Sequence, residues 1–213
     1  MRRFLLLAHK VPTDGAFTLN DLAGGAGRMD EVARAVSTAF TLSNDLRRDT
    51  ELAVLFVAQP PPRARRIELM GARLRYLNPD ERSTAALLKN ALVGASRYPS
   101  DFESSPGLRV GPVDPLPYLA TFLRGDGAVW LTEAGRPVSE VDRFGPELRA
   151  VVSDPFDPSP EEVDVLRGSG APAVSVGPLS LRTSQVVDAV HRELDVREAA
   201  GPMPTLPPAR DPP

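Results

Sequence analysis

Apolar residues along this chain form two kinds of pattern, short apolar runs and helical spacings. Short apolar runs that end at charges, glycines or prolines are typical of buried strands. Such runs predict strands at residues 3–8, 51–58, 128–132, 148–152 and 174–176. Apolar residues at helical spacing predict helices at residues 30–44, 84–94, 116–124, 161–169 and 186–195. Because strands and helices alternate, the sequence predicts an α/β fold with a mostly parallel sheet and helices on both faces.

Turn-forming residues predict how these elements begin and end. Asp30 is the expected N-cap of the first helix, since a short carboxylate can accept the first free backbone N–H groups. Gly71 is the expected turn of a hairpin between short strands at residues 67–70 and 73–76. Residues 97–114 are rich in proline and glycine and are predicted as loop.

The C-terminal end differs in composition from the rest of the chain. Residues 199–213 are rich in proline and have no apolar periodicity, so we expect a disordered tail there. Residues 144–148 are predicted as a short helix or turn. Residues 1–198 then form a single domain, which is an ordinary size for one hydrophobic core.

Composition narrows the kinds of site that this chain can build. It has 213 residues, no cysteine, a net charge of −3, and only two histidines, His9 and His191. The lack of cysteine excludes disulfides, thiol nucleophiles and thiolate metal sites, and so few histidines argue against a zinc centre. We therefore expect no metal. The acidic balance means that any RNA contact must come from local arginine clusters.

The N-terminus begins with two arginines and an apolar run, as a signal peptide does. Its apolar part is too short, and His9, Lys10 and Asp14 follow immediately, so a core strand is the favoured interpretation. No apolar run approaches the roughly 20 residues that a membrane helix needs. We expect a cytoplasmic protein with no membrane contact.

Two strand-to-loop junctions predict one shared small-molecule pocket. Residues 148–152 run into a proline-rich loop, and residues 174–176 run into Gly177-Pro178 and a polar loop before the last helix. Loops at the carboxyl ends of strands are where α/β proteins hold ligands. From the residues alone, an ordinary strand–turn–helix connection remains the alternative.

Six sequence blocks in one order resemble a known family. They are Ala39-Phe-Thr-Leu-Ser-Asn-Asp-Leu-Arg-Arg-Asp49, Leu74-Arg-Tyr-Leu-Asn-Pro-Asp-Glu-Arg-Ser-Thr-Ala-Ala-Leu-Leu88, Val129-Trp-Leu-Thr-Glu-Ala-Gly135, Val151-Val-Ser-Asp-Pro-Phe-Asp-Pro-Ser-Pro-Glu-Glu162, Val174-Ser-Val-Gly-Pro-Leu179 and Val190-His-Arg-Glu-Leu-Asp195. Together they resemble SPOUT-superfamily RNA methyltransferases, most of all the archaeal-type enzymes that methylate N1 of tRNA pseudouridine 54. The resemblance runs from residue 1 to about residue 197. It implies a C-terminal trefoil knot, which the pattern alone would not predict because connections rarely thread through loops.

The resemblance also implies S-adenosylmethionine as cofactor, held at the two strand-to-loop junctions. The implied contacts are Val152, Ser153, Asp154, Gly177, Leu179, Ser180, Leu181, Arg182, Thr183 and Val186. Glycine and short polar residues let backbone donors and acceptors approach an adenine edge. The chain departs from the family pattern twice: Val186 stands where cysteine is frequent, and Pro-Phe follows Asp154 where His-Gly is usual.

Asp49 is the candidate catalytic residue. Methylation of pseudouridine N1 displaces a ring proton, which a nearby carboxylate can accept. Asp49 follows Arg47 and Arg48 and directly precedes a predicted central strand, where α/β proteins place reactive groups. A salt bridge between arginine and Asp49 that braces the strand explains the same residues equally well.

Arginines are expected to supply RNA contacts. The candidates are Arg47, Arg48, Arg63, Arg65, Arg66, Arg73 and Arg75. Alternating arginines on a strand point to one side and can follow a phosphate backbone. A charged edge strand, protected against aggregation, is the alternative. Residues 24–27 are glycine-rich but lack the lysine of a phosphate-binding loop, so a flexible loop near RNA is favoured over an anion site.

The predicted function is S-adenosylmethionine-dependent methylation of tRNA by a homodimer. We expect the dimer to form through an apolar face of the last helix, made by Val187, Val190 and Leu194, with His191 at the surface or at the dimer contact. Trp130 is expected in the core. The alternatives are methylation of a ribosomal pseudouridine or a ribose 2′-hydroxyl, and a non-catalytic α/β protein that binds RNA or a ligand.

Overall fold

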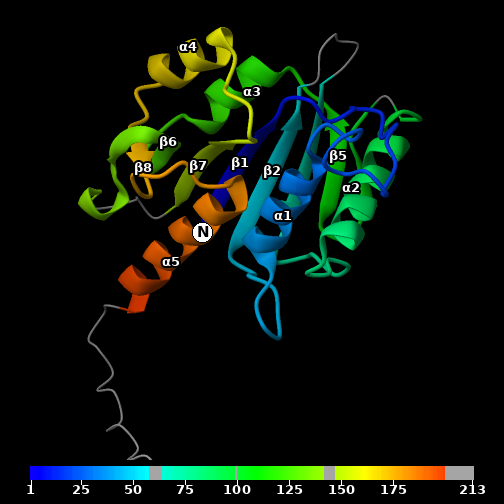
Figure 1. Cartoon of the computed structure of the whole chain (residues 1–213), viewed down its shortest axis with the longest axis horizontal. Coiled ribbons are helices and arrows are strands. Elements are labelled where there is room, and N and C mark those ends of the chain that lie inside the picture. The colour runs from blue at the N-terminus through cyan, green and yellow to red at the C-terminus, as the bar shows by residue number, and fades with distance from the viewer. Residues whose placement is uncertain (58–63, 99, 142–146, 200–213) are drawn as a thin grey trace, which may run out of the picture.

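One mixed sheet organises the chain. The computed structural model describes residues 1–57, 64–98, 100–141 and 147–199. Within these residues eight strands form a single sheet in the order β4-β5-β3-β2-β1-β7-β6-β8 (Figure 1). The parallel part consists of β2 (Thr50–Phe56), β1 (Arg2–Ala8), β7 (Leu148–Ser153), β6 (Ala128–Pro137) and β8 (Ala173–Ser175). The carboxyl ends of these strands therefore lie at one edge of the sheet.

The other part of the sheet is antiparallel and corrects two predictions. β3 (Arg65–Met70) pairs with β2 and with β5 (Leu108–Pro112), so the expected hairpin around Gly71 is wrong, and residues 73–76 form no strand. β5 forms a hairpin with β4 (Phe102–Ser105) inside the stretch that was predicted as loop. β4 and β5 are short, each contains a charged residue, and Pro106-Gly107 separates them, so neither shows the continuous apolar run of a central strand.

Helices cover both faces of the sheet, as the alternating pattern predicted. α1 (Met29–Phe40), α2 (Glu81–Ala95) and α5 (Thr183–Ala199) share one hydrophobic core with one face. α3 (Pro115–Phe122) and α4 (Pro160–Gly168) cover the other face, where they share a second core (Figure 1). A single 3₁₀ turn, η1 (Val138–Glu140), follows β6 in the described part of the chain.

Strand β1 shows why the continuous apolar runs are central. Phe4 and Leu6 point into the core under α1 and α5, whereas Leu5 and Leu7 point into the core under α3 and α4. All four side chains are at most 1% exposed. At about 25 cal/mol per Å² of apolar surface, burial of such side chains is a main source of the free energy of folding. Because successive side chains of a strand point to opposite faces of the sheet, β1 contributes to both hydrophobic cores.

Two helix predictions need correction. Asp30 does not cap α1: the helix begins at Met29, and the cap position is Arg28, in a left-handed conformation with φ 70°. Val187, Val190 and Leu194 of α5 are buried in the core of the same protomer, where α5 packs against α1. This face of α5 is therefore not available to a partner subunit.

Two further predictions fall partly outside the described residues. Residues 200–213, most of the predicted tail, and residues 144–146 of the turn predicted at 144–148 lie outside the described residues, whereas Leu148 begins β7. Among the described helices, none is long and apolar enough to cross a membrane.

Candidate functional site

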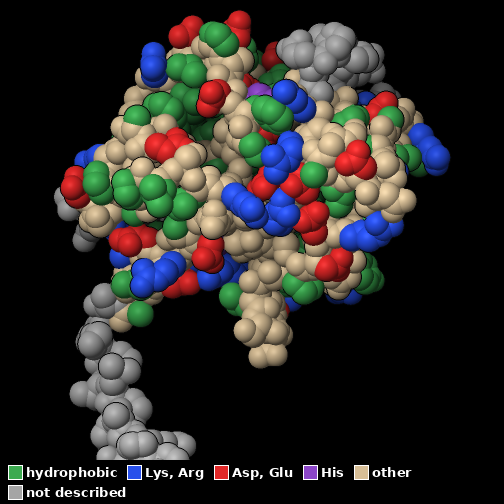
Figure 2. Space-filling view, in the orientation of Figure 1, with side chains coloured by type: hydrophobic (Ala, Val, Ile, Leu, Met, Phe, Trp, Pro, Cys, Tyr) green, Lys and Arg blue, Asp and Glu red, His purple; other side chains and the backbone are tan. Residues whose placement is uncertain are grey.

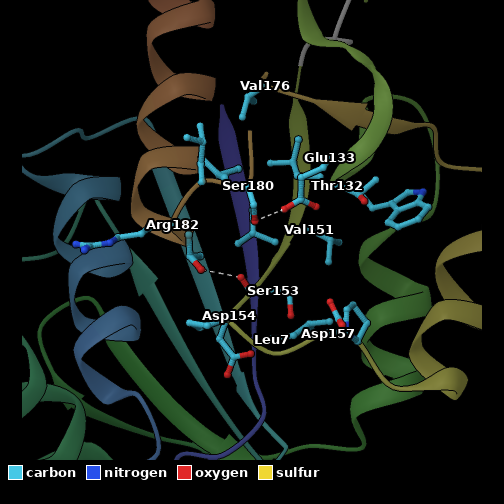
Figure 3. Close-up of a pocket in the computed structure, with 18 of the residues that line it drawn as sticks. Leu7, Thr132, Glu133, Val151, Ser153, Asp154, Asp157, Val176, Ser180 and Arg182 are labelled. Atoms are coloured by element: carbon cyan, nitrogen blue, oxygen red, sulfur yellow. Dashed lines mark hydrogen bonds between the residues drawn. The ribbon is translucent and has the colours of Figure 1, made fainter. Parts of the chain in front are cut away.

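A cavity of about 570 Å³ lies at the carboxyl ends of β7 and β8, beside the middle of β6 and the start of α5 (Figure 3). Every residue that the sequence assigns to the cofactor lies on its wall. The lining consists of Leu7, Arg28, Glu31, Trp130–Glu133, Val151–Pro158, Leu166, Val174–Gly177, Leu179–Thr183 and Val186. The two junctions are adjacent because β6 pairs with both β7 and β8. Trp130, expected in the core, is half-buried: it packs against the core under α3 and α4 and also lies on this wall.

The loop after β7 is held in place by a buried carboxylate. Asp154 accepts a hydrogen bond from the backbone N–H of His9 at 2.8 Å, and its Oδ1 lies 2.7 Å from Nδ1 of the His9 ring. It also accepts from the backbone N–H of Phe156 at 3.2 Å. Lys10 lies 3.8 Å from the centroid of the Phe156 ring, a cation–π contact. Asp154 thus ties the Pro-Phe sequence of this chain to the end of β1.

His9 connects the same loop to α4. Its Nε2 lies 3.0 Å from Oε2 of Glu162, which also closes a capping box with Ser159 at the start of α4. Burial lowers the pKa of His9, but hydrogen bonds and charges from Asp154 and Glu162 outweigh it and raise the pKa to about 9. The His9 ring is therefore a cation at neutral pH, flanked by two carboxylates.

The loop between β8 and α5 forms the facing wall. Thr183 donates its hydroxyl hydrogen bond to the backbone carbonyl of Ser153 at 2.8 Å, which joins the two loops directly. Ser180 donates to Glu133 at 2.7 Å (Figure 3). An added Cβ on Gly177 would meet no atom within 4 Å, and the backbone there is not left-handed. Gly177 therefore leaves open space rather than permitting an unusual turn.

Comparison with known proteins shows the family to which this chain belongs. A family model described as "Putative SAM-dependent RNA methyltransferase" matches residues 1–199. Proteins named tRNA (pseudouridine(54)-N(1))-methyltransferase are similar along nearly their whole length. The relative from Methanosarcina mazei is 39% identical over 93% of both chains, and that from Thermococcus gammatolerans is 38% identical over 92% of this chain and 97% of its own.

The chain belongs to the family of S-adenosylmethionine-dependent RNA methyltransferases. Its fold is also similar to that of a solved structure, Archaeoglobus fulgidus Nep1 bound to S-adenosylhomocysteine. The TM-score is 0.60 and the sequence identity is 14%, with 93% of this chain and 98% of Nep1 covered. Likeness at this identity concerns the fold, and the family assignment rests on the sequence matches.

Asp49 does not lie at the cavity of this methyltransferase. It precedes β2, at the amino ends of the parallel strands, whereas the cavity lies at their carboxyl ends. Strands of this length separate the two edges by roughly 20 Å. Oδ2 of Asp49 lies 3.3 Å from Nε of Arg2, and the Asp49 carbonyl accepts from the Arg2 backbone N–H at 2.9 Å. This placement supports the brace, with Arg2 as the partner.

The arginines next to Asp49 are engaged within the protein. Arg47 forms a bidentate pair with Asp195 of α5, at 3.0 and 2.7 Å. Arg48 donates to the carbonyls of Gly71 and Leu74 at 3.0 and 2.8 Å. The hydrogen bond to Arg47 is the largest of the contacts that lower the pKa of Asp195 to about 2. Both arginines thus connect segments of the fold.

The arginines around β3 do not form a row that points to solvent. Arg65 is only 8% exposed and donates to the carbonyl of Ala95, which leaves little of its side chain accessible to a phosphate. Arg66 pairs with Glu68 and Asp101, and Arg73 pairs with Glu103 at 2.9 Å. Among the remaining candidates, Arg75 is exposed, and Arg63 lies outside the described residues.

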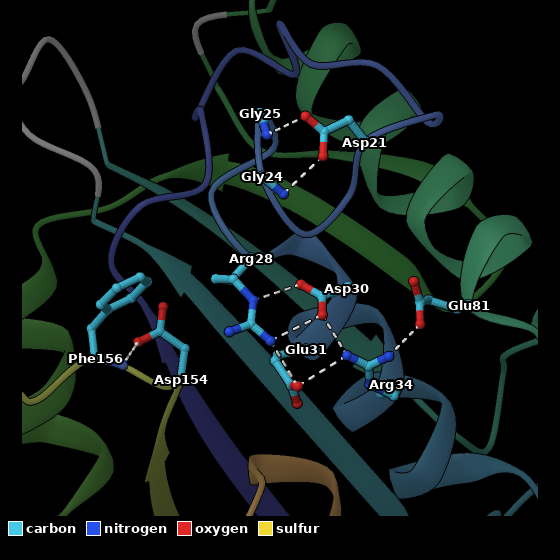
Figure 4. Close-up of polar contacts among 10 residues, drawn as sticks. All are labelled: Asp21, Gly24, Gly25, Arg28, Asp30, Glu31, Arg34, Glu81, Asp154 and Phe156. Atoms are coloured by element: carbon cyan, nitrogen blue, oxygen red, sulfur yellow. Dashed lines mark hydrogen bonds and ion pairs between the residues drawn. The ribbon is translucent and has the colours of Figure 1, made fainter.

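His191 and the glycine-rich loop also differ from expectation. His191 is 1% exposed, its ring is tilted against that of Phe4 with the ring centroids 5.0 Å apart, and its two ring nitrogens each lie 3.1 Å from a partner, Nη1 of Arg2 and the carbonyl of Ala39. Burial, aided by Arg47 and Arg2, lowers the pKa of His191 to about 4. In the glycine-rich loop, the backbone N–H groups of Gly24 and Gly25 donate to Asp21, at 2.9 and 2.7 Å (Figure 4). The carboxylate of Asp21 therefore occupies the backbone N–H groups that an external anion would need.

Sequence reasoning missed Arg28 and Glu31, which lie on the cavity wall at the start of α1. They come from a segment more than 100 residues before the two junctions in the chain. The signal that could have found them is the charge pattern Arg28-Met-Asp-Glu31, which places one basic and two acidic residues at the start of an otherwise apolar helix face.

Proposed function

We propose that this protein transfers the methyl group of S-adenosylmethionine to N1 of pseudouridine 54 in tRNA. The observation that carries the proposal is the 39% identity, over 93% of the chain, to a relative named for this reaction. The cavity supports it, because its wall unites the two loops in which the family resemblance places the cofactor.

The residues of the cavity fit S-adenosylmethionine. Its volume of about 570 Å³ is within the range of small-molecule sites, about 300–1,000 Å³. Val176 and Val186 provide apolar surface, while Thr132, Ser153 and the backbone of residues 177–183 provide hydrogen-bonding groups. When bound, the cofactor supplies a methyl group on a positively charged sulfur.

The chain itself has to orient the reactants, because a displacement at a methyl carbon depends on alignment. The two loops that would hold the cofactor are joined through Thr183 and Ser153, and the first is braced by Asp154 against His9. These contacts fix the wall before a ligand binds. Less ordering is then needed on binding, which favours affinity.

The wider assignment follows the family resemblance. We infer a homodimer, a C-terminal trefoil knot in the β7–α5 region, a tRNA partner and a cytoplasmic location. Because the apolar face of α5 is buried against α1, a dimer would use its outward face, where Asp188, Arg192 and Val196 lie beside Arg47. A mixed polar and apolar face of this kind is compatible with a subunit interface.

The activity is tested with purified protein and two tRNAs that differ only at position 54. We expect calorimetry to detect S-adenosylmethionine binding, and radiolabelled methyl groups to appear on tRNA with pseudouridine 54 but not on tRNA with uridine 54. Methylation of both tRNAs would indicate another RNA position. Binding of cofactor and tRNA without any methylation would indicate a non-catalytic protein.

A further inference from the structure

The first turn of α1 carries a buried carboxylate that forms part of the cavity wall. Glu31 is 3% exposed and lines the cavity that also includes Ser153, Thr183 and Val186. The residue just before α1 is Arg28. In the described part of the chain it is the one non-glycine residue with a positive φ, which is 70°. A left-handed conformation at arginine costs free energy, so the contacts made by its side chain must compensate for it.

One oxygen of Glu31 is held by two arginines. Oε1 accepts hydrogen bonds from Nη2 of Arg28 and from Nη2 of Arg34, each at 2.9 Å (Figure 4). Arg28 also forms a bidentate pair with Asp30, at 3.0 and 3.1 Å, and Arg34 pairs with Asp30 and with Glu81 of α2. The network fixes the position of Glu31 and balances its charge with two guanidinium groups.

The other oxygen of Glu31 has no partner among the described residues. Oε2 is shielded from solvent and accepts no hydrogen bond, and in Figure 4 it points away from both guanidinium groups. A buried carboxylate oxygen without a donor is costly, and because Glu31 lines the cavity, a ligand that enters the cavity can supply the donor. The other charged groups on this wall are Arg28, Asp154, Asp157, Glu133 and Arg182.

We propose that Glu31 is the catalytic base, which accepts the proton from N1 of the target pseudouridine. This inference rests on the proposed function. Oε2 takes the N1 proton, and N1 uses the electron pair of the broken N–H bond to form the bond to the methyl carbon. The carbon–sulfur bond breaks, its electrons stay on sulfur, and the products are N1-methylpseudouridine, S-adenosylhomocysteine and protonated Glu31.

The proposal gives Glu31 the role that sequence reasoning gave Asp49. Glu31 belongs to the cavity wall, whereas Asp49 lies at the opposite edge of the sheet and is half-exposed beside Arg2. Arg28 and Arg34 are positioning residues in this arrangement, because they act on the substrate through the orientation of Glu31.

Glu31→Gln tests the proposal, since the amide keeps the shape and loses the base. We expect the single-turnover rate on tRNA with pseudouridine 54 to fall by about a hundredfold at neutral pH, a typical contribution of a general base. The ratio of wild-type to variant rate should shrink as pH rises, because N1 then ionises without help. Calorimetric affinity for S-adenosylmethionine should stay within about threefold.

Glu51→Gln is the matched control. It removes a carboxylate that pairs with an arginine elsewhere in the fold, at 2.9 Å from Nε of Arg3, and Glu51 is not part of the cavity wall. We expect its rate to stay near wild type. An equal loss in both variants, or a loss in Glu31→Gln that does not change with pH, would show that the loss comes from a broken ion pair rather than a missing base and would overturn the proposal.

A second variant keeps the test decisive if Glu31→Gln does not fold. Glu31→Asp retains the charge and withdraws the carboxylate by one methylene group, so we expect at least a tenfold loss of rate in a folded protein. A wild-type rate in either folded variant would overturn the role of Glu31 but would leave the proposed function in place. A wild-type protein that fails to methylate tRNA would instead contradict the proposed function.

Discussion

Single residues at the cavity differ in whether they act on the protein or on its ligand. An added Cβ on Gly177 would meet no protein atom within 4 Å, and the same is true of Gly168 at the end of α4. Only Gly177 lies on the cavity wall. Valine substitutions at these two glycines therefore separate an effect on ligand binding from an effect of the valine side chain on the protein.

We expect Gly177→Val to fold normally and to bind S-adenosylmethionine at least about tenfold more weakly, which is about 1.4 kcal/mol. The branched side chain would occupy space that the ligand needs. Calorimetry on Gly177→Val and on Gly168→Val measures this, and the Gly168 variant should bind as the wild type does. Equal affinities in all three proteins would place the cofactor elsewhere.

Asp49 is the residue for which the structure changes the expected outcome. Asp49→Asn should leave the methylation rate per folded molecule nearly unchanged, because the carboxylate pairs with Arg2 far from the cavity. Loss of a half-exposed ion pair should reduce the free energy of unfolding by less than about 1 kcal/mol. Thermal melts and single-turnover rates on one preparation measure both quantities. A hundredfold slower rate without loss of stability would restore Asp49 as the base.

At the scale of elements, one cluster of side chains joins β1, the loop after β7, and α4. His9, Asp154 and Glu162 come from these three segments, and their side chains are 14%, 1% and 5% exposed. Contacts between Glu162 and both His9 and Ser159 lower the pKa of Glu162 in spite of its burial. The cluster therefore stabilises the cavity wall through charges that depend on pH.

The raised pKa of His9 predicts a loss of stability in mild alkali. The pKa rises from 6.5 to about 9 on folding, so its contribution is complete below pH 6.5 and is lost as pH rises towards 9. The upper bound of this contribution is on the order of 3 kcal/mol, at 1.36 kcal/mol per pKa unit. Denaturant unfolding of wild type and His9→Gln should show a stability difference that narrows between pH 6.5 and 9. A difference that stays constant across this range would show that His9 is not charged in the folded protein.

The antiparallel part of the sheet shows that a local sequence pattern does not always predict a strand. β4 and β5 are short, and charged residues interrupt them, so their own composition is that of a loop. Pairing of β5 with β3, about 40 residues earlier in the chain, makes them strands. Local propensity is a weak signal for strands because cross-strand packing supplies most of the preference.

At the scale of the whole molecule, charge is distributed in pairs. Figure 2 shows Lys and Arg side chains intermingled with Asp and Glu over the face that carries α1, in line with the ion pairs of Arg28 and Arg34. A net charge of −3 adds no general attraction for RNA. A tRNA partner therefore has to be recognised by local groups and by the shape of the cavity mouth.

The sequence by itself determined the family, the central buried strands, most of the helices and the residues of the two loops that line the cavity. Each of these is a local property: apolar runs, helical spacing and contiguous blocks of sequence are all readable without knowledge of distant contacts. Residues 152–154, 177, 179–183 and 186 could be predicted to line one cavity because each group lies within a short stretch of the chain.

Only the tertiary structure decided which charged residues meet and which face the cavity. His9 and Asp154 are 145 positions apart, Arg47 and Asp195 are 148 apart, and Glu31 reaches the cavity from a helix that precedes both loops. A carboxylate or an arginine has the same chemistry in a brace as in a site. Its role depends on the partners that the packing of β1, α1 and α5 brings to it, and partners that are distant in sequence cannot be predicted from the local pattern.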